Sequence, residues 1–167
     1  PKSDVLYFGR IAPYKGIEYL VKAINQIKQK YNHIHVVIAG GGDFYFDIWS
    51  EIDNNFTIIN RFLSNEELVN LISRTKIVVT PYTEATQSGV VMTAYAFRKP
   101  VIATNVGGLS EVVLHNETGK VVPPNNTSEL SDAIIQVLED NENIKDYQKN
   151  IEKLSQYGRY SWENIAQ

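Results

Sequence analysis

Two cations lie five positions apart in a loop that follows a short apolar run. The segment FGRIAPYKG (8–16) places Arg10 and Lys15 on either side of Pro13, between a predicted strand end and a predicted helix start. Gly9 allows a tight turn at the strand end. An arginine fork and a mobile lysine charge beside a helix N-terminus are suited to holding a diphosphate. Taken alone, the loop is explained more simply by two solvated surface cations, because such pairs are common.

A second candidate phosphate site lies where the run Thr-Gln-Ser-Gly (86–89) opens a nearly all-apolar helical stretch. Ser88 or Thr86 can cap this helix. Four main-chain amides at its start are predicted to bind an anion with help from the helix dipole: those of Gln87, Ser88, Gly89 and Val90. A well-capped core helix is the alternative, but it does not explain why the helix begins with these small and hydroxylated residues.

Glycine-rich segments mark two further predicted strand ends. IAGGGD (38–43) permits close approach of a ligand or of a neighbouring loop, but it lacks the spacing of a dinucleotide fingerprint, so a plain turn is the simpler explanation. NVGGLSEVV (105–113) places Glu111 in the first turn of a short predicted helix. An acid is favourable there, because it faces the positive end of the helix dipole.

Composition excludes several classes of function. The chain has 167 residues and a net charge of −3, so we expect one domain and no general attraction to nucleic acid. It has no cysteine, which excludes disulfides and thiolate metal sites, and its three histidines lack metal-ligand spacing. No apolar run is long enough to span a membrane and no signal peptide is present, so we expect a cytoplasmic protein. The first residue is not methionine, which indicates a fragment of a longer chain.

Alternating strand and helix patterns must position these loops. Six apolar runs are predicted as strands: 5–8, 34–39, 56–59, 77–80, 101–104 and 119–122. Longer stretches are predicted as helices: 16–31, 64–73, 88–98, 126–140 and the polar tail 142–167. The alternation predicts an α/β fold, a Rossmann-like parallel sheet with helices on both faces in three α/β/α layers. Ligands of such sheets lie at the carboxyl ends of the strands, which selects the loops after residues 8, 39, 80 and 104.

In order and spacing, five segments together resemble the C-terminal, donor-binding half of family 4 (group 1) glycosyltransferases with the GT-B fold. They are FGRIAPYKG, IAGGGD, VVTPY, AYAFRKPVIATNVGGLSEVV and TGKVVPPNN. The resemblance covers essentially the whole chain. It implies that residues 1–167 form a single nucleotide-sugar-binding domain, and that an N-terminal acceptor-binding domain of the same chain is absent here.

The resemblance assigns roles residue by residue. Arg10 and Lys15 match the family's pair, which grips the donor diphosphate and stabilises the departing charge. The family's two glutamates, one contacting the transferred sugar and one holding the ribose, fall on Ala85 and Thr93. Both acids are therefore absent in register, although Glu84 is only one residue early.

Further contacts follow from the same alignment. Glu111 matches the acid of the family's Gly-Gly-x-x-Glu turn, and with Glu84 and Thr93 it is a predicted contact of the ribose or the sugar. Arg61 and Phe62, in the loop after Ile59, are predicted to lie near the nucleotide base, although the family commonly has a glycine in this loop. A hydroxyl at Thr93 can still form one hydrogen bond to the ribose, and a neutral bond of this kind is weaker than a charge-assisted one.

The resemblance implies a retaining transferase that moves a sugar from a nucleoside-diphosphate sugar to an acceptor, in polysaccharide or glycolipid synthesis. The nucleotide sugar is the substrate, and no cofactor or metal is expected, because fixed cations and a helix N-terminus do the work of a metal. The isolated domain is expected to be inactive, and any peripheral membrane association is expected to come from the missing half. One alternative is a non-catalytic sugar-nucleotide-binding or scaffold domain that retains the fold. A second is a GT-B sugar-nucleotide epimerase, whose acid and histidine groups have no counterpart that the sequence identifies.

Overall fold

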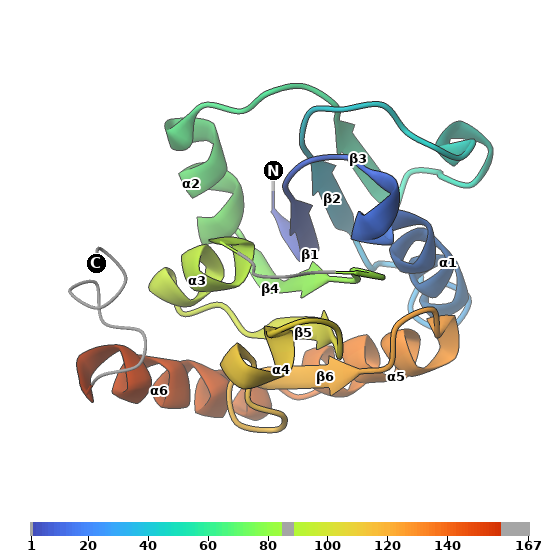
Figure 1. Cartoon of the computed structure of the whole chain (residues 1–167). Coiled ribbons are helices and arrows are strands. Elements are labelled where there is room, and N and C mark those ends of the chain that lie inside the picture. Colours follow the sequence, from blue (N-terminus) through green and yellow to red (C-terminus); the bar gives the residue numbers. More distant parts are fainter. Residues whose placement is uncertain (1, 85–88, 158–167) are drawn as a thin grey trace.

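A single parallel sheet organises the molecule. The computed structural model describes residues 2–84 and 89–157. Six strands lie in the order β3-β2-β1-β4-β5-β6, and every neighbouring pair is parallel (Figure 1). The strands are β1 (Ser3–Phe8), β2 (Val36–Ala39), β3 (Phe56–Ile59), β4 (Thr75–Thr80), β5 (Val101–Thr104) and β6 (Gly119–Val122). Strand order reverses between β1 and β4, and the carboxyl ends of strands at such a reversal are where parallel α/β sheets bind their ligands.

Helices cover both faces of the sheet, which confirms the predicted three-layer α/β architecture. The α-helices are α1 (Ile17–Ile27), α2 (Asn65–Ser73), α3 (Gly89–Ala96), α4 (Leu109–Val112), α5 (Thr127–Leu138) and α6 (Asn141–Tyr157). Two short 3-10 turns, η1 (Pro13–Lys15) and η2 (Ile48–Ser50), lie in loops. Helices α1 and α5 pack together on one face, and α2 and α3 lie on the other (Figure 1).

The central strands are apolar because they are buried on both faces. Every residue of β2 and β5 is buried, and so are the last four residues of β1. In a parallel sheet with helices on both sides neither face meets water, so side chains of alternate orientation are apolar alike. This continuous burial produces the unbroken apolar runs from which the strands were predicted.

Side-chain caps fix the start of two helices. The Ser64 hydroxyl accepts a hydrogen bond from the Glu67 N–H at 3.2 Å at the start of α2. The Asn126 side chain accepts one from the Glu129 N–H at 3.0 Å at the start of α5. Each cap satisfies one main-chain donor that lacks a partner within the helix.

Some predicted element ends are displaced. Strand β2 begins at Val36 rather than at Ile34, because the Ile34 N–H is used in a turn, where it donates to the Tyr31 carbonyl at 3.2 Å. Helix α1 ends at Ile27, four residues before the predicted end. Strands β1 and β4 each begin two residues earlier than predicted. The end of the predicted C-terminal helix, residues 158–167, lies outside the described residues.

Helix α3 ends in a left-handed turn at Arg98, where φ is 57°. The Arg98 N–H donates to the Tyr95 carbonyl at 2.9 Å, and the Lys99 N–H donates to the Ala94 carbonyl at 3.0 Å. These two bonds form a Schellman cap, whose left-handed position is usually a glycine. Pro100 follows and prevents further helix. An arginine here therefore carries backbone strain that a glycine would not.

We expect Arg98→Gly to stabilise the protein by about 1 kcal/mol, because relief of this strain outweighs the loss of an exposed ion pair. That pair joins the Arg98 guanidinium to Glu152 at 3.5 Å. Urea unfolding measures the difference. Arg98→Ala is the matched control, because it removes the ion pair and keeps the strain. A glycine variant no more stable than the alanine variant would contradict this account.

Candidate functional site

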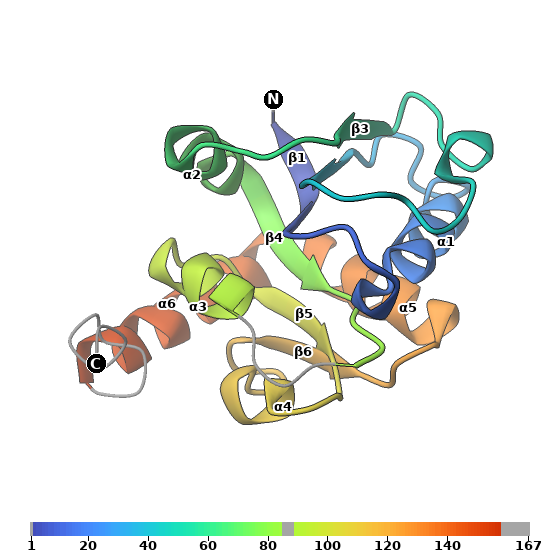
Figure 2. The same ribbon diagram turned by 45° about the horizontal axis from the view of Figure 1, so that its top comes forward.

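The loops after β1 and β4 are joined into one surface at the reversal of strand order (Figure 2). The Thr83 N–H donates to the Tyr14 carbonyl at 2.9 Å, which links the β4 loop to η1. Gly16, directly after η1, has a φ of 67°, and a Cβ built on it would lie 1.9 Å from the Pro81 carbonyl oxygen. Only a glycine allows both this backbone conformation and this approach. The position of η1 and its lysine is thus fixed against β4.

The two predicted cations lie on this surface. The Arg10 side chain is exposed and the Lys15 side chain is half-buried. Burial lowers the pKa of Lys15, and the charge of Arg10 lowers it further. Within residues 2–84 and 89–157, neither side chain has an ion pair or hydrogen bond to an acidic group. Two neighbouring cations without a counter-ion form a positive spot that favours an anionic ligand.

Tyrosines contact the main chain of Arg10 and the ammonium of Lys15, and sequence reasoning missed them. The Tyr7 hydroxyl donates to the Arg10 carbonyl at 2.6 Å. Burial raises the pKa of Tyr7, so the phenol stays protonated as a donor. The Lys15 ammonium lies 4.3 Å from the centroid of the Tyr82 ring and 5.1 Å from that of Tyr14. One signal was present in the sequence: a tyrosine within a buried aliphatic strand needs a hydrogen-bond partner for its hydroxyl.

The first turn of α3 lies next to the β1 loop. A Cβ built on Gly9 would lie 3.6 Å from Val90 Cγ2. Two of the predicted amide donors, those of Gly89 and Val90, thus belong to the helix end beside the Arg10 loop. The other two, Gln87 and Ser88, lie outside the described residues, as does Ala85. The cationic loop and the described start of α3 therefore face one region, as a shared diphosphate site requires.

Three further predicted contacts lie on segments that leave the carboxyl edge of the sheet. Thr93 is on α3, and its hydroxyl donates to the Gly89 carbonyl at 2.8 Å. Its single hydrogen is thus used, and its oxygen lone pairs remain to accept a hydrogen bond. Glu84 is exposed in the β4 loop, immediately before the residues that are not described. Glu111 is exposed on α4, which follows β5.

The loop after β3 contains the residues predicted to meet the base. The Arg61 guanidinium is paired with Glu67 of α2, with 2.6 Å between Nη1 and Oε2. Phe62 is 89% exposed. A large apolar ring so open to solvent offers a stacking face for a base. Of the two predicted base contacts, Phe62 has a free face and Arg61 already has a charged partner.

The glycines of the β2 loop serve the approach of neighbouring loops. The Ile11 N–H donates to the Gly41 carbonyl at 2.8 Å, which joins this loop to the Arg10 loop. The Asn60 side-chain amide donates to the carbonyls of Gly40, at 3.1 Å, and Gly42, at 2.9 Å. The sequence favoured a plain turn here, and the structure shows the close approach of neighbouring loops instead. Asn60 gave no signal in the sequence beyond its polar type.

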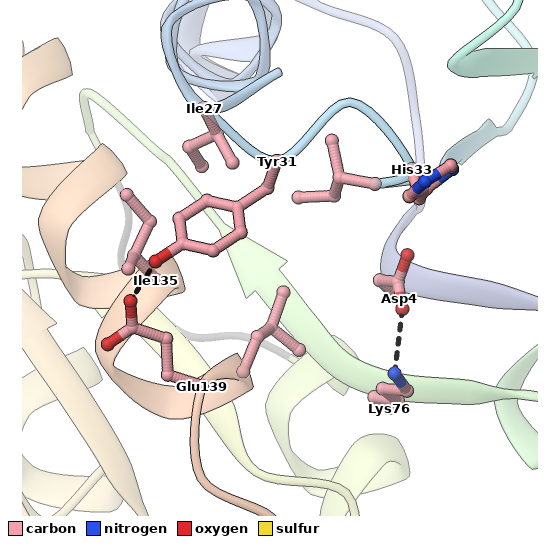
Figure 3. Close-up of a pocket in the computed structure, with 9 residues that line it drawn as sticks. Asp4, Ile27, Tyr31, His33, Lys76, Ile135 and Glu139 are labelled. Atoms are coloured by element: carbon pink, nitrogen blue, oxygen red, sulfur yellow. Dashed lines mark hydrogen bonds and ion pairs between the residues drawn. The ribbon is translucent and has the colours of Figure 1, made fainter. Parts of the chain in front are cut away.

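A hollow of about 220 Å³ opens at the opposite, amino edge of the sheet, between α1 and α5 (Figure 3). Its walls are mainly aliphatic: Ile27, Ile34, Ile135 and Leu138. Tyr31 is hydrogen-bonded to Glu139 across its mouth, and Asp4 is paired with Lys76 at 3.0 Å (Figure 3). Shape alone would favour this hollow as a ligand site. We favour the carboxyl edge, because its two cations have no acidic partner among the described residues, whereas these polar groups pair with one another.

Two further findings concern metal and membrane. Across the described residues, no group of three or more acidic, histidine or cysteine side chains is arranged to hold a metal ion. No described helix is both long enough and apolar enough to cross a membrane.

Comparison with known proteins connects this geometry to a family. Residues 2–140 match the family model of "Glycosyl transferases group 1". The chain belongs to the group 1 glycosyltransferases. An uncharacterised glycosyltransferase of Methanocaldococcus jannaschii, MJ1607, is 32% identical over 97% of this chain and 42% of its own length. The resemblance predicted from the sequence motifs is therefore confirmed.

Solved structures place this group 1 glycosyltransferase chain in the GT-B fold. The sucrose-phosphate synthase of Thermosynechococcus elongatus matches with a TM-score of 0.85 and 30% identity, over 99% of this chain and 43% of the synthase. HepE of Anabaena, solved in complex with UDP-glucose, matches with a TM-score of 0.80 and 20% identity, over 98% of this chain and 47% of HepE. The chain spans less than half the length of each of these proteins, and it has the fold of a GT-B C-terminal half.

Proposed function

We propose that this domain binds the nucleoside-diphosphate sugar donor of a retaining glycosyltransferase. The observation that carries the proposal is the pair of cations, Arg10 and Lys15, at the reversal of strand order, for which the described residues offer no acidic partner. A diphosphate is the anion that best matches two neighbouring cations beside a helix start. The bound complexes of structural neighbours agree with this choice, since HepE was solved with UDP-glucose.

The proposed chemistry is electrostatic. When the bond between the sugar and the terminal phosphate breaks, the electron pair stays on the phosphate oxygen and the diphosphate gains negative charge. Arg10 and Lys15, with the amides at the start of α3, would stabilise this charge more strongly than that of the intact donor. Because these charges are fixed by the protein, we propose that the transfer needs no metal.

Sugar and ribose are proposed to be recognised without the family's usual acids. Thr93 has only an acceptor lone pair to offer a ribose hydroxyl, because its hydrogen is used by the Gly89 carbonyl. Glu84 and Glu111 remain candidates for contacts with the sugar or the ribose. Phe62 is proposed to stack on the base, with Arg61 at its side.

The complete enzyme is proposed to contain an N-terminal acceptor-binding domain in the same chain, so that this domain alone is inactive. We propose a hexose as the transferred sugar and polysaccharide or glycolipid synthesis in the cytoplasm as its setting. Any peripheral association with a membrane is proposed to come through that other domain.

Calorimetry with UDP, GDP, ADP and inorganic pyrophosphate tests the donor site on this chain. At least one nucleoside diphosphate is expected to bind with a Kd below about 1 mM, or about −4 kcal/mol. Pyrophosphate is expected to bind more weakly at the same site, because it makes no ribose or base contact. If none of the four ligands binds at millimolar concentration, the proposed function is wrong.

A non-catalytic binding domain is the second candidate, and the loss of both family glutamates at Ala85 and Thr93 favours it. Both candidates predict nucleotide binding, so turnover separates them. The complete enzyme, supplied with the corresponding nucleotide sugar, is expected to release nucleoside diphosphate. A complete chain that binds the nucleotide sugar but releases none would favour the non-catalytic domain.

A further inference from the structure

The Lys15 ammonium lies against an aromatic ring where a carboxylate counter-ion would be expected. Its Nζ is 4.3 Å from the centroid of the Tyr82 ring, well within the range of a cation–π contact. Tyr82 follows β4 directly and is 1% exposed, whereas the lysine is half-buried. The ring therefore forms a rigid wall beside the charge, and the Tyr14 ring lies further away at 5.1 Å.

Three contacts fix the main chain around Tyr82 relative to the turn that contains the lysine. The Thr104 hydroxyl of β5 donates to the Tyr82 carbonyl at 2.6 Å. The next residue, Thr83, donates its N–H to the Tyr14 carbonyl in η1, the same turn that contains Lys15. Gly16 packs on the Pro81 carbonyl on the other side. The ring and the ammonium therefore belong to two loops, those after β4 and β1, that are joined by main-chain contacts.

We propose that Tyr82 is a positioning residue for Lys15, whose ring orients the ammonium toward the diphosphate without neutralising it. The proposal rests on the proposed function, since it concerns how the donor site keeps its charge. A half-buried lysine usually gains a carboxylate partner, and that partner would cancel the charge the diphosphate needs. A π face attracts the cation through its quadrupole and carries no net charge. Such a contact restricts the side chain and leaves its full charge available to a ligand.

A double-mutant cycle on Lys15 and Tyr82 tests the proposal, with inorganic pyrophosphate and UDP as the probes. Tyr82→Leu is expected to weaken pyrophosphate binding about fivefold, which is the loss of a cation–π contact of about 1 kcal/mol. Tyr82→Phe is expected to restore most of this affinity, because the ring remains. In a Lys15→Ala background, Tyr82→Leu is expected to change affinity less than about twofold, because the partner it acts through is gone.

Controls separate positioning from packing. Tyr147→Leu removes another buried tyrosine ring, on α6 away from the candidate site, and is expected to lower stability without changing pyrophosphate affinity. Thermal unfolding of every variant shows whether it is folded. If Tyr82→Leu does not fold, Tyr82→Met replaces it, since a flexible methionine fills the space more readily.

The outcomes distinguish the two proposals. If Lys15→Ala weakens binding but Tyr82→Leu does not, the positioning role is wrong and the donor site stands. The same holds if Tyr82→Leu weakens binding equally with and without Lys15, because the effect would then be structural. If the wild-type chain binds neither probe, the positioning role is overturned. If it also binds neither GDP nor ADP, the donor site is overturned with it.

Discussion

Removing both cations, in Arg10→Ala/Lys15→Ala, is expected to weaken binding of a nucleoside diphosphate by at least about 100-fold. Each side chain is proposed to form charge-assisted hydrogen bonds with the diphosphate, and such bonds contribute about 1.5–3 kcal/mol each. Neither cation has an acidic partner among the described residues, so no internal ion pair offsets the loss. Calorimetry with UDP measures the change in Kd on this chain.

Charge-matched variants show whether the effect is local. Lys2→Ala/Arg74→Ala removes the same two charges at the amino edge, before β1 and β4, and is expected to leave Kd within about twofold, since distant exposed charges are screened by salt. Arg10→Lys keeps the charge but loses the planar fork, so part of the affinity should be lost. Equal weakening by the amino-edge variant would mean that general charge, and no specific site, attracts the nucleotide.

In the complete enzyme the same two cations are expected to matter more for the reaction than for binding. The leaving diphosphate carries more negative charge than the intact donor, so the cations stabilise the transition state preferentially. Loss of one fixed electrostatic contact of this kind lowers kcat by about 100- to 1000-fold in other enzymes. A larger fall in kcat than in donor affinity would support this. Equal falls in both would indicate binding alone.

The fold was predictable because burial imposes one pattern on all central strands. Residues such as Val36, Val37 and Ile38 meet helices on both faces, so an unbroken apolar run is a direct consequence of the architecture. The ends of elements were less predictable. Ile34 is apolar and buried like the residues of β2, yet it precedes the strand, because hydrophobicity reports burial and does not report which main-chain groups join the ladder.

The candidate site was likewise predictable only in part. Arg10 and Lys15 were identified from the sequence because they lie in one short loop, with spacing that a known family shares. The contact between Lys15 and Tyr82 joins positions far apart in the chain, and it exists only because β1 and β4 are neighbours in the sheet. The pairing of Arg61 with Glu67 likewise depends on how the β3 loop enters α2. A single sequence shows the spacing of residues along the chain. It does not show which residues of different elements come into contact.

Two glycines of the β2 loop, Gly40 and Gly41, are expected to differ sharply in their tolerance of alanine. A Cβ built on Gly40 would lie 1.7 Å from the Gly9 carbonyl oxygen, directly below the Arg10 loop. Backbone conformation is not the obstacle, because Gly40 is not among the glycines with positive φ. The clash is with main chain that the sheet holds in place, since the Gly9 N–H donates to the Ala39 carbonyl at 3.0 Å. Gly40→Ala must therefore displace one loop from the other.

We expect Gly40→Ala to destabilise the protein by about 3 kcal/mol, the upper range for overpacking, and to lower Tm by about 6–12 °C for a chain of this size. Because the displaced segment precedes Arg10, UDP affinity should also fall in protein that remains folded. Thermal unfolding and calorimetry measure the two effects. Gly41→Ala is the control, because its Cβ would lie 3.5 Å from the nearest atom, the Phe62 nitrogen, at ordinary contact distance. Equal Tm values for the two variants would mean that the β2 loop does not approach the Gly9 carbonyl closely. The account of how the Arg10 loop is held in place would then be wrong.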